Sequence, residues 1–294
     1  MKKILLTGGS GFIGRNILES TLAQKYQIFA PRHSELDVSD TQSVDDYFKN
    51  QSFDVVLHSA TKPGHRNAKD PTNLFYTNVR MFENLERHKD KFGKFINFGS
   101  GAIYDVSANN SGVTEEDIYK NLGKDDHSFC KYVVHKQIDH LDNFIDLNIF
   151  GIFGKYEDYA IRFISNACCK ALFDLPITLR QNRRFSYIDV ADLPVILELL
   201  IENKTQYKSY NIVPNSYIEL KNLAQSVRQV SGKDIDIKIA QDGYGLDYYG
   251  SNKRLMQEFP EIKFTPIEQS IQNLYRYYEQ NKTAINYNQL LEDK

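Results

Sequence analysis

Tryptophan is absent from this 294-residue sequence, cysteine occurs only three times, and the formal net charge is only −2. The three cysteines, Cys130, Cys168 and Cys169, are too few for a disulfide framework, so we expect a reducing compartment, the cytoplasm. The near-zero charge argues against a nucleic-acid-binding protein, which would carry a basic excess. No apolar run approaches the roughly 20 residues that span a bilayer. We therefore expect a chain that binds neither nucleic acid nor membrane.

Strand and helix patterns alternate through the first half of the chain. Short apolar runs typical of buried strands occupy 3–6, 26–30, 53–57, 94–98 and 147–153. Apolar residues recur at helical spacing between them, over 12–22, 44–48, 74–89 and 128–142. Strands that alternate with helices indicate βαβ units, and right-handed crossovers then give a parallel sheet with helices on both faces.

The second half of the chain has a looser pattern. The polar segment 105–126 is predicted to be a loop with at most one helical turn. Helices are expected at 162–172, 190–202, 220–230 and 267–278, with a strand at 177–179. We predict an α/β protein with a Rossmann-type, doubly wound parallel sheet in 1–154, to which 183–204 returns. A smaller C-terminal substrate-binding domain would occupy mainly 155–294.

A glycine-rich turn follows the first strand and opens the first helix. Its sequence, Thr7-Gly-Gly-Ser-Gly-Phe-Ile-Gly14, contains the G-x-G-x-x-G pattern of dinucleotide-binding folds. The glycines permit a tight turn and let a pyrophosphate approach the backbone, and the helix N-terminus favours its negative charge. The predicted cofactor-binding residues of this turn are Gly8, Ser10, Gly11, Phe12, Ile13 and Gly14.

The end of the second strand bears on the choice of cofactor. NAD-binding enzymes place an acidic residue there to bind the ribose 2′-hydroxyl. This strand ends at Pro31-Arg32-His33, with two potential cations and no acid. Arg32 and His33 would accommodate a 2′-phosphate, so NADP(H) is favoured over NAD(H). Glu35 would reverse the argument if the turn were shorter.

Five segments together resemble a known family. They are the glycine-rich turn, Leu57-His-Ser-Ala-Thr61, Asn78-Val79, Phe98-Gly-Ser-Gly-Ala-Ile-Tyr104 and Arg183-Arg-Phe-Ser-Tyr-Ile-Asp189. In this order they resemble the extended short-chain dehydrogenase/reductases, in the NAD(P)-dependent nucleotide-sugar epimerase/dehydratase/reductase branch. The segment 32–54 and the Gly99-Ser-x-x-Ile-Tyr104 signature look most like the GDP-fucose synthase-like 4-keto sugar reductases.

The resemblance implies roles for particular residues. Ser100 matches the catalytic hydroxyl that binds the substrate oxygen, and Arg183 matches the arginine that binds the sugar-nucleotide diphosphate. A bidentate guanidinium suits that second task. Asp37 and Val38 would face the adenine. The remaining cofactor contacts implied by the resemblance are His58, Ser59, Ala60, Thr61 and Asn78.

The family's catalytic pair is Tyr-x-x-x-Lys on a helix, and two alignments of it are possible here. The literal match is Tyr132 with Lys136. The fuller pattern Tyr-Gly-x-Ser-Lys instead aligns with 127–131, where His127 replaces the tyrosine and Lys131 is the lysine. On a helical wheel, His127 and Lys131 lie at the edge of the core face, whereas Tyr132 and Lys136 point toward solvent. We favour His127 and Lys131 and keep the literal match as the alternative.

The resemblance implies an enzyme that reduces the C4 ketone of a nucleotide-activated 4-keto-6-deoxy sugar, or a related keto sugar, in the biosynthesis of surface polysaccharides. Protonated His127 could donate a proton to the developing alkoxide, although the charge of Lys131 would lower the pKa of His127. One alternative is a nucleotide-sugar epimerase that holds NAD(P) tightly. Another is a non-catalytic, cofactor-sensing protein. No metal is expected, and the family's habit of pairing through helices near the active site implies a homodimer.

Overall fold

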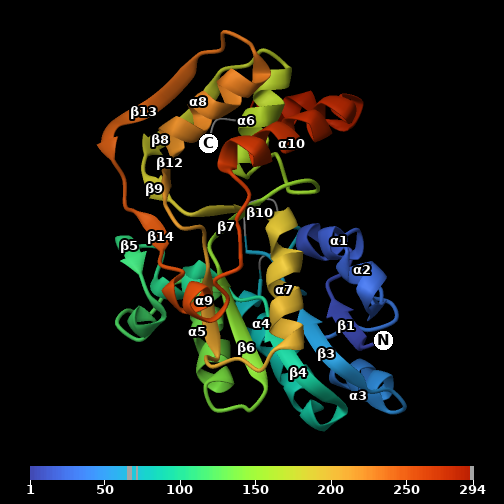
Figure 1. Ribbon diagram of the computed structural model, residues 1–294. Coiled ribbons are helices and arrows are strands. Elements are labelled where there is room, and N and C mark those ends of the chain that lie inside the picture. Colours follow the sequence, from blue (N-terminus) through green and yellow to red (C-terminus); the bar gives the residue numbers. More distant parts are fainter. Residues whose placement is uncertain (65–67, 71, 292–294) are drawn as a thin grey trace.

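A computed structural model of the chain describes residues 1–64, 68–70 and 72–291. Its centre is a six-stranded parallel sheet with the strand order β11-β6-β4-β3-β1-β2 (Figure 1). The strands are β1 (Lys3–Thr7), β2 (Gln27–Phe29), β3 (Phe53–His58), β4 (Phe92–Asn97), β6 (Phe144–Ile149) and β11 (Ser209–Ile212). The order reverses at β1, so β2 and β3 lie on opposite sides of it. This confirms the predicted Rossmann-type α/β fold.

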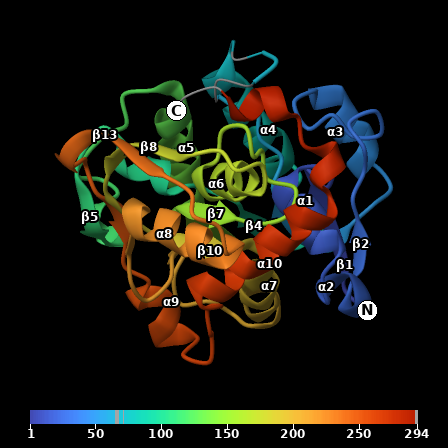
Figure 2. The ribbon, with the colours of Figure 1, turned by 90° about the horizontal axis from the view of Figure 1, so that it is seen from above.

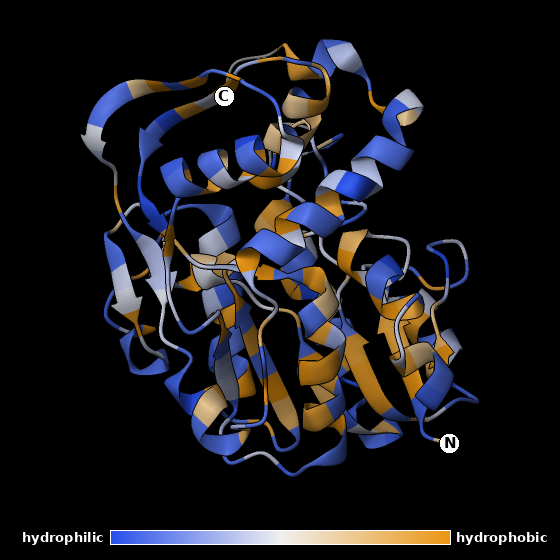
Figure 3. Cartoon of the chain, turned by 45° about the horizontal axis from the view of Figure 1, so that its top comes forward, coloured by the Kyte–Doolittle hydropathy of each residue, from blue (hydrophilic) through white to orange (hydrophobic). Residues whose placement is uncertain are grey.

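Helices cover both faces of this sheet because its strands are apolar on both sides (Figure 3). One face packs against side chains of α1 (Phe12–Leu18), α2 (Leu22–Lys25) and α7 (Leu193–Glu202). The other face packs against α3 (Thr41–Phe48), α4 (Leu74–Glu86) and α5 (Asp126–Ile138). The two apolar clusters hold the carboxyl ends of the strands in a fixed arrangement.

A third apolar cluster, built mainly from helices, lies beyond those carboxyl ends (Figures 1 and 2). It contains α6 (Phe163–Leu172), α8 (Leu220–Ser231) and α10 (Ile267–Gln280), packed on the two-stranded sheet of β8 (Ile177–Asn182) and β13 (Ile237–Tyr244). The helix α7 returns to the central sheet, and so do β11 and side chains of α9 (Lys253–Glu258). The division of the chain into two domains stays a prediction.

Short strands join the two parts of the molecule. They are β7 (Gly151–Phe153) with β10 (Tyr187–Asp189), and the four-stranded sheet β12 (Ile218–Glu219), β9 (Arg184–Phe185), β14 (Tyr248–Gly250) and β5 (Asn110–Val113). The prediction that 105–126 is a loop was therefore wrong over β5. Its pattern carries no strand signal, and β5 forms because it pairs with β14, far away in the sequence.

The predicted strand 147–153 is interrupted. The chain leaves β6 after Ile149 and enters β7 at Gly151, where the backbone passes close to β10. A Cβ on Gly151 would lie 2.5 Å from the carbonyl oxygen of Ser186. The apolar run reads as continuous because both strands are buried, so hydropathy alone does not reveal the break.

A buried ion pair fastens α5 to the sheet. His135 Nδ1 on α5 lies 2.9 Å from Asp146 Oδ2 on β6, and Asn97 on β4 donates to the other oxygen of Asp146 at 2.7 Å. Burial disfavours the charged imidazole, but the hydrogen bond and charge of Asp146, helped by Asp139, outweigh it and raise the pKa of His135. The contact fixes the rotation of α5 about its axis, and thereby the direction in which its first turn faces.

We expect this pair to make stability depend on pH. Because the pKa of His135 is higher in the folded than in the unfolded chain, its stabilising contribution is complete below the unfolded value, about 6.5. The contribution is lost as the pH rises through the folded value. The difference in free energy of unfolding between the wild type and His135→Gln should therefore be larger at pH 6 than at pH 9. Equal differences in urea titrations at both pH values would contradict the assignment.

Candidate active site

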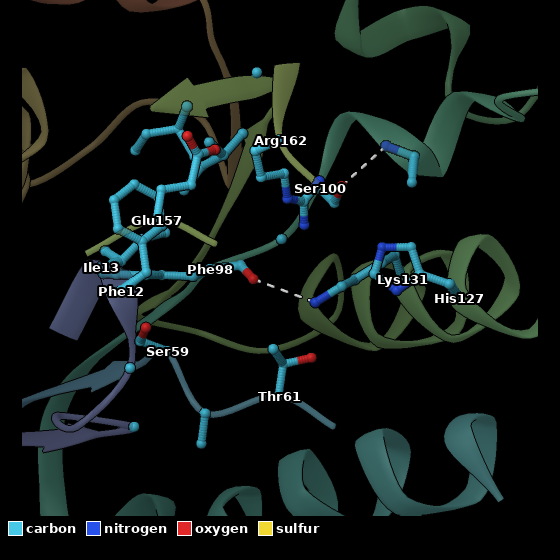
Figure 4. A pocket seen from close by; sticks show the side chains of 18 of the residues that line it. Phe12, Ile13, Ser59, Thr61, Phe98, Ser100, His127, Lys131, Glu157 and Arg162 are labelled. Atoms are coloured by element: carbon cyan, nitrogen blue, oxygen red, sulfur yellow. Dashed lines mark hydrogen bonds between the residues drawn. The ribbon is translucent and has the colours of Figure 1, made fainter. Parts of the chain in front are cut away.

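A cavity of about 930 Å³ lies along the carboxyl ends of β1, β3, β4 and β6 and continues toward the C-terminal part (Figure 4). In doubly wound sheets this crevice is where ligands bind. The glycine-rich turn lines one end, α5 one wall, and segments around β7, β9, β10 and β14 the far end. The cavity is large enough for a dinucleotide and part of a second ligand.

The glycine-rich turn cannot accept side chains at two positions. Gly8 has φ of +72°, and a Cβ there would lie 2.7 Å from the backbone nitrogen of Ala60. A Cβ on Gly14 would lie 2.3 Å from the carbonyl oxygen of Gly8. Gly11 closes the turn by donating from its backbone N–H to Gly8 at 3.0 Å. The turn thus brings bare backbone to the cavity, which fits a pyrophosphate.

The first two turns of α5 supply His127 and Lys131 to the cavity wall (Figure 4). The helix begins here because the Asp125 carboxylate accepts from the backbone N–H of Ser128 at 3.0 Å. The Lys131 ammonium donates to the carbonyl oxygen of Phe98 at 3.3 Å. The favoured alignment therefore places both of its residues at the cavity.

The residues of the literal match do not line this cavity. Lys136 is exposed, as the helical wheel predicts. Tyr132 is not solvent-facing as expected: it is half-buried, and its ring packs edge-on against Tyr119 with centroids 5.9 Å apart. The wheel misplaced Tyr132 because the segment 105–126, taken for an open loop, covers that side of α5.

The imidazole of His127 is neutral near pH 7. Burial, and then the positive charges of Lys131 and Arg162, lower the pKa of His127 to about 4, against a smaller opposing effect of Asp125. Its Nδ1 atom is buried and has no hydrogen-bond partner among the described residues. The neutral ring can donate one N–H and accept at the other nitrogen.

Ser100 and Arg183 also line the cavity. The Ser100 hydroxyl follows β4 and accepts from the backbone N–H of Ala102 at 3.1 Å, so its own proton remains available to a second partner. The guanidinium of Arg183 lies 5.1 Å from the Phe185 ring centroid, and burial lowers its pKa. Its Nε is buried without a partner among the described residues.

Most of the other predicted cofactor contacts meet at the cavity wall. They are Gly8, Ser10, Gly11, Phe12, Ile13, His33, Asp37, Val38, Ser59, Ala60 and Thr61. Four predicted residues do not line it: Gly14, Arg32, His58 and Asn78. Gly14 shapes the turn from behind, and Arg32 is exposed beside the wall. A direct cofactor contact of these four stays a prediction.

His58 and Asn78 point into the protein instead. Burial, and then the charge of Lys131, lower the pKa of His58 to about 3, and His58 Nδ1 is hydrogen-bonded to the Thr7 hydroxyl at 2.8 Å. The amide oxygen of Asn78 accepts from the Thr61 hydroxyl at 3.0 Å and from the Lys62 backbone at 2.8 Å. Through these hydrogen bonds, both residues stabilise the segments at the ends of β1 and β3 that line the cavity.

Sequence reasoning missed several wall residues of the far end. Glu157, Arg162, Tyr187 and Tyr248 bring a carboxylate, a cation and two phenols to the cavity, and the buried Glu157 carboxylate accepts from the Ser165 hydroxyl. The segment 149–153 follows β6 and also lines it. The rule that ligands bind at the carboxyl ends of parallel strands could have indicated that segment. No local signal marks Tyr248.

The residues that follow the second strand lie partly in the cavity wall and partly outside it. Pro31 and His33 line the cavity, and Arg32 follows on the exposed side. The Glu35 carboxylate does not line the cavity; it accepts from the backbone N–H of Arg32 at 2.7 Å. The preference for NADP(H) over NAD(H) stays a prediction.

The family model of the NAD dependent epimerase/dehydratase family matches residues 4–213. The chain therefore belongs to this family. Similar curated proteins include the GDP-L-colitose synthase of Yersinia pseudotuberculosis, 27% identical over 172 residues. Another is the GDP-L-fucose synthase of Azorhizobium caulinodans, 29% identical over 178 residues. Each match covers 53% of this chain and 56% or 54% of the relative, so the chain spans about half the length of these relatives.

Two solved structures share the fold over nearly the whole chain. A GDP-L-fucose synthetase from Naegleria fowleri superposes with a TM-score of 0.84 at 15% identity, covering 96% of this chain and 94% of that one. A GDP-mannoheptose C4 reductase from Campylobacter jejuni, solved with NADP bound, gives 0.79 at 18% identity and covers 95% and 98%.

Proposed function

We propose that the protein is an NADP(H)-dependent enzyme that reduces the C4 ketone of a nucleotide-activated 4-keto-6-deoxy sugar or a closely related keto sugar. The observation that carries the proposal is the meeting of Ser100, His127 and Lys131 in one cavity with the glycine-rich turn. Family membership and the likeness to the GDP-sugar synthases named above support it.

Different residues of the cavity wall would serve different parts of the reaction. The glycine-rich turn would hold the pyrophosphate, Lys131 the nicotinamide ribose, and Arg183 the diphosphate of the sugar nucleotide. The reduced nicotinamide, when bound, supplies a hydride to the carbonyl carbon. Ser100 and His127 bind the carbonyl oxygen and stabilise the negative charge that develops there, and a proton reaches the oxygen through this pair.

The proposal favours NADPH over NADH through Arg32 and His33. Replacing both by alanine should weaken NADPH binding about tenfold, because a charged hydrogen bond to a phosphate is worth about 1.5–3 kcal/mol before screening by solvent. NADH binding should hardly change. Isothermal titration with each cofactor measures both effects. The exposed Arg228 on α8 offers a matched control, and Arg228→Ala should leave both affinities unchanged. Equal losses for NADPH and NADH would contradict the role of this pair.

An epimerase is the second candidate, and one observation favours it. A histidine with a pKa of about 4 is unprotonated at pH 7, so His127 could accept a proton from a sugar hydroxyl while a tightly held cofactor took the hydride. The same group would return the proton after the keto intermediate had turned in the cavity.

Assays with purified protein separate the candidates. A reductase oxidises NADPH in amounts equal to the keto sugar nucleotide consumed, across a panel that varies the nucleotide. An epimerase interconverts stereoisomers with no net cofactor consumption. A non-catalytic sensor binds the cofactor, turns over nothing and is indifferent to Ser100→Ala. Only the first outcome supports the proposed function.

The homodimer implied by the family resemblance also remains a proposal. Phe129 on α5 and Phe75 on α4 stack with ring centroids 5.1 Å apart, and Phe129 and Tyr76 keep much of their surface exposed. A second copy pairing through α4 and α5 would cover these rings.

None of the helices in the described part of the chain has the length and apolar character needed to cross a membrane.

A further inference from the structure

A buried carboxylate forms part of the cavity wall shortly after β7. Glu157 lines the cavity and is only 7% exposed. Figure 4 shows it across the cavity from His127 and Lys131, on the side of Phe12 and Ile13. Burial of a carboxylate is costly unless hydrogen-bond donors surround it. None of the steps of the proposed reduction involves this carboxylate.

The carboxylate is oriented by a residue of α6. The Ser165 hydroxyl, which is fully buried, donates to the Glu157 carboxylate. An ionised carboxylate only accepts hydrogen bonds, and its two oxygens can accept several at once. The contact with Ser165 therefore fixes the group without excluding a ligand. A ligand group that fits this part of the wall must carry an O–H or an N–H.

The backbone next to Glu157 is held in an unusual conformation by α1. Tyr156 has φ of +74°, in the left-handed region that residues other than glycine seldom adopt. Its hydroxyl donates to the Glu19 carboxylate at 2.7 Å, and the Arg15 guanidinium lies 3.5 Å from its ring centroid. The Asn16 amide donates to the carbonyl oxygen of Lys155 at 3.0 Å. Strained conformations held by their surroundings recur at ligand-binding sites, and this one directs the following residue into the cavity.

Glu157 also contacts the C-terminal part of the molecule. Its carbonyl oxygen accepts from the Tyr278 hydroxyl of α10 at 3.4 Å. The residue thus lies where α1, α6 and α10 meet. In the proposed function, Arg183 holds the diphosphate of the sugar nucleotide and Ser100 binds its carbonyl oxygen. The sugar ring would lie between these two groups, inside the cavity whose wall includes Glu157.

We propose that Glu157 is a specificity-determining residue that accepts a hydrogen bond from a ring hydroxyl of the keto sugar; this inference rests on the proposed function. The hydroxyls at C2 and C3 are the two candidates, because C4 carries the ketone and C6 is deoxygenated. A sugar that is deoxygenated or acylated at the recognised carbon leaves the buried carboxylate without that donor. The substrate is therefore a sugar with a free hydroxyl at this position.

The test compares Glu157→Gln with the wild type on three substrates. They are a 4-keto-6-deoxy-hexose linked to GDP, UDP, dTDP or CDP, and its 2-deoxy and 3-deoxy counterparts. In the wild type, one of the two deoxy sugars should have a KM about tenfold above that of the parent sugar, because it lacks a hydrogen bond to a charged group. In Glu157→Gln, this ratio should fall to about threefold, since a neutral amide oxygen accepts more weakly.

Only the KM of the parent sugar should rise in Glu157→Gln, with kcat close to wild type, because the hydrogen bond is present both before and during the reaction. Equal KM values for all three sugars in the wild type, or an unchanged ratio in the variant, would overturn the inference. Glu115→Gln is the matched control. Glu115 is also buried, accepts from the Asn211 backbone N–H at 2.6 Å and does not line the cavity, so its variant should keep the wild-type ratio.

Cofactor binding tests another use of the same carboxylate. The carboxamide of a nicotinamide also carries N–H donors, and Glu157 could bind it in place of the sugar. Titration calorimetry should give the same NADPH affinity for Glu157→Gln and the wild type. A loss of NADPH affinity in the variant would assign the carboxylate to the cofactor and overturn the inference.

A binding experiment separates this inference from the proposed function. The probes are GDP, UDP, dTDP and CDP, each alone and linked to a 6-deoxy-hexose, titrated in the presence of NADP⁺. Glu157→Gln should weaken binding of the preferred sugar-linked probe about threefold and leave the free nucleotide unchanged. Equal losses for both probes, or no loss, would overturn the inference. If the sugar-specific loss is found but the wild type reduces no keto sugar nucleotide, the proposed reduction fails and the role of Glu157 in sugar binding stands.

Discussion

Replacing His127 by alanine should lower kcat about a hundred- to ten-thousandfold while changing KM little. The residue lines the cavity beside Lys131, and a neutral imidazole offers one hydrogen-bond donor and one acceptor to a ligand bound there. Removing one preformed donor to an oxyanion costs about 10²–10³ in kcat, and loss of an acid–base group up to about 10⁴. Steady-state kinetics at saturating NADPH measure the effect.

The control for this experiment is Tyr132→Phe. Tyr132 belongs to the literal Tyr-x-x-x-Lys match but lies outside the cavity wall, so its variant should keep kcat within about twofold. His127→Gln tests the chemistry more finely, because an amide restores an N–H donor without an acid–base group. It should recover part of the lost kcat. A fully active His127→Ala together with an inactive Tyr132→Phe would return the catalytic role to Tyr132 and Lys136.

The parallel sheet and the glycine-rich turn could be predicted because their signals are local. Each apolar run in 1–100 forms a strand close to where it was expected, since a strand buried on both faces must be apolar throughout. In the turn at 7–14, backbone atoms approach one another too closely for side chains, and the glycines mark those positions in the sequence. The choice between His127 and Tyr132 also rested on local helical geometry, and the structure brings the favoured pair to the cavity.

The far end of the cavity, formed by the segments around β7, β9, β10 and β14, could not be predicted because it depends on contacts between segments distant in the sequence. β5 and β14 pair across more than a hundred residues, and neither has a repeating apolar pattern of its own. Tyr248 enters the cavity wall only because β14 lies between β5 and β9. The sequence alone has no means of placing Tyr248 in that wall.

The second large effect should come from Gly14→Ala in the glycine-rich turn. The added methyl group would lie 2.3 Å from the Gly8 carbonyl oxygen and 2.7 Å from the Gly9 Cα, both backbone atoms that cannot rotate away. The turn must move to relieve the clash. Overpacking of this kind costs about 1–3 kcal/mol in free energy of unfolding. The same displacement should weaken NADPH binding roughly ten- to a hundredfold, because it moves the backbone N–H groups that would face the pyrophosphate.

Gly11→Ala separates the clash from the simple loss of a glycine. A Cβ on Gly11 would lie 3.3 Å from the same Gly8 oxygen, a distance that a shift of a few tenths of an ångström relieves. Without cofactor, Gly11→Ala should unfold in urea at nearly the wild-type midpoint and Gly14→Ala well below it. Equal midpoints for the two variants would mean that close packing at Gly14 does not set the turn. If only Gly14→Ala loses both stability and NADPH affinity, the same backbone conformation of the turn is needed for folding and for cofactor binding.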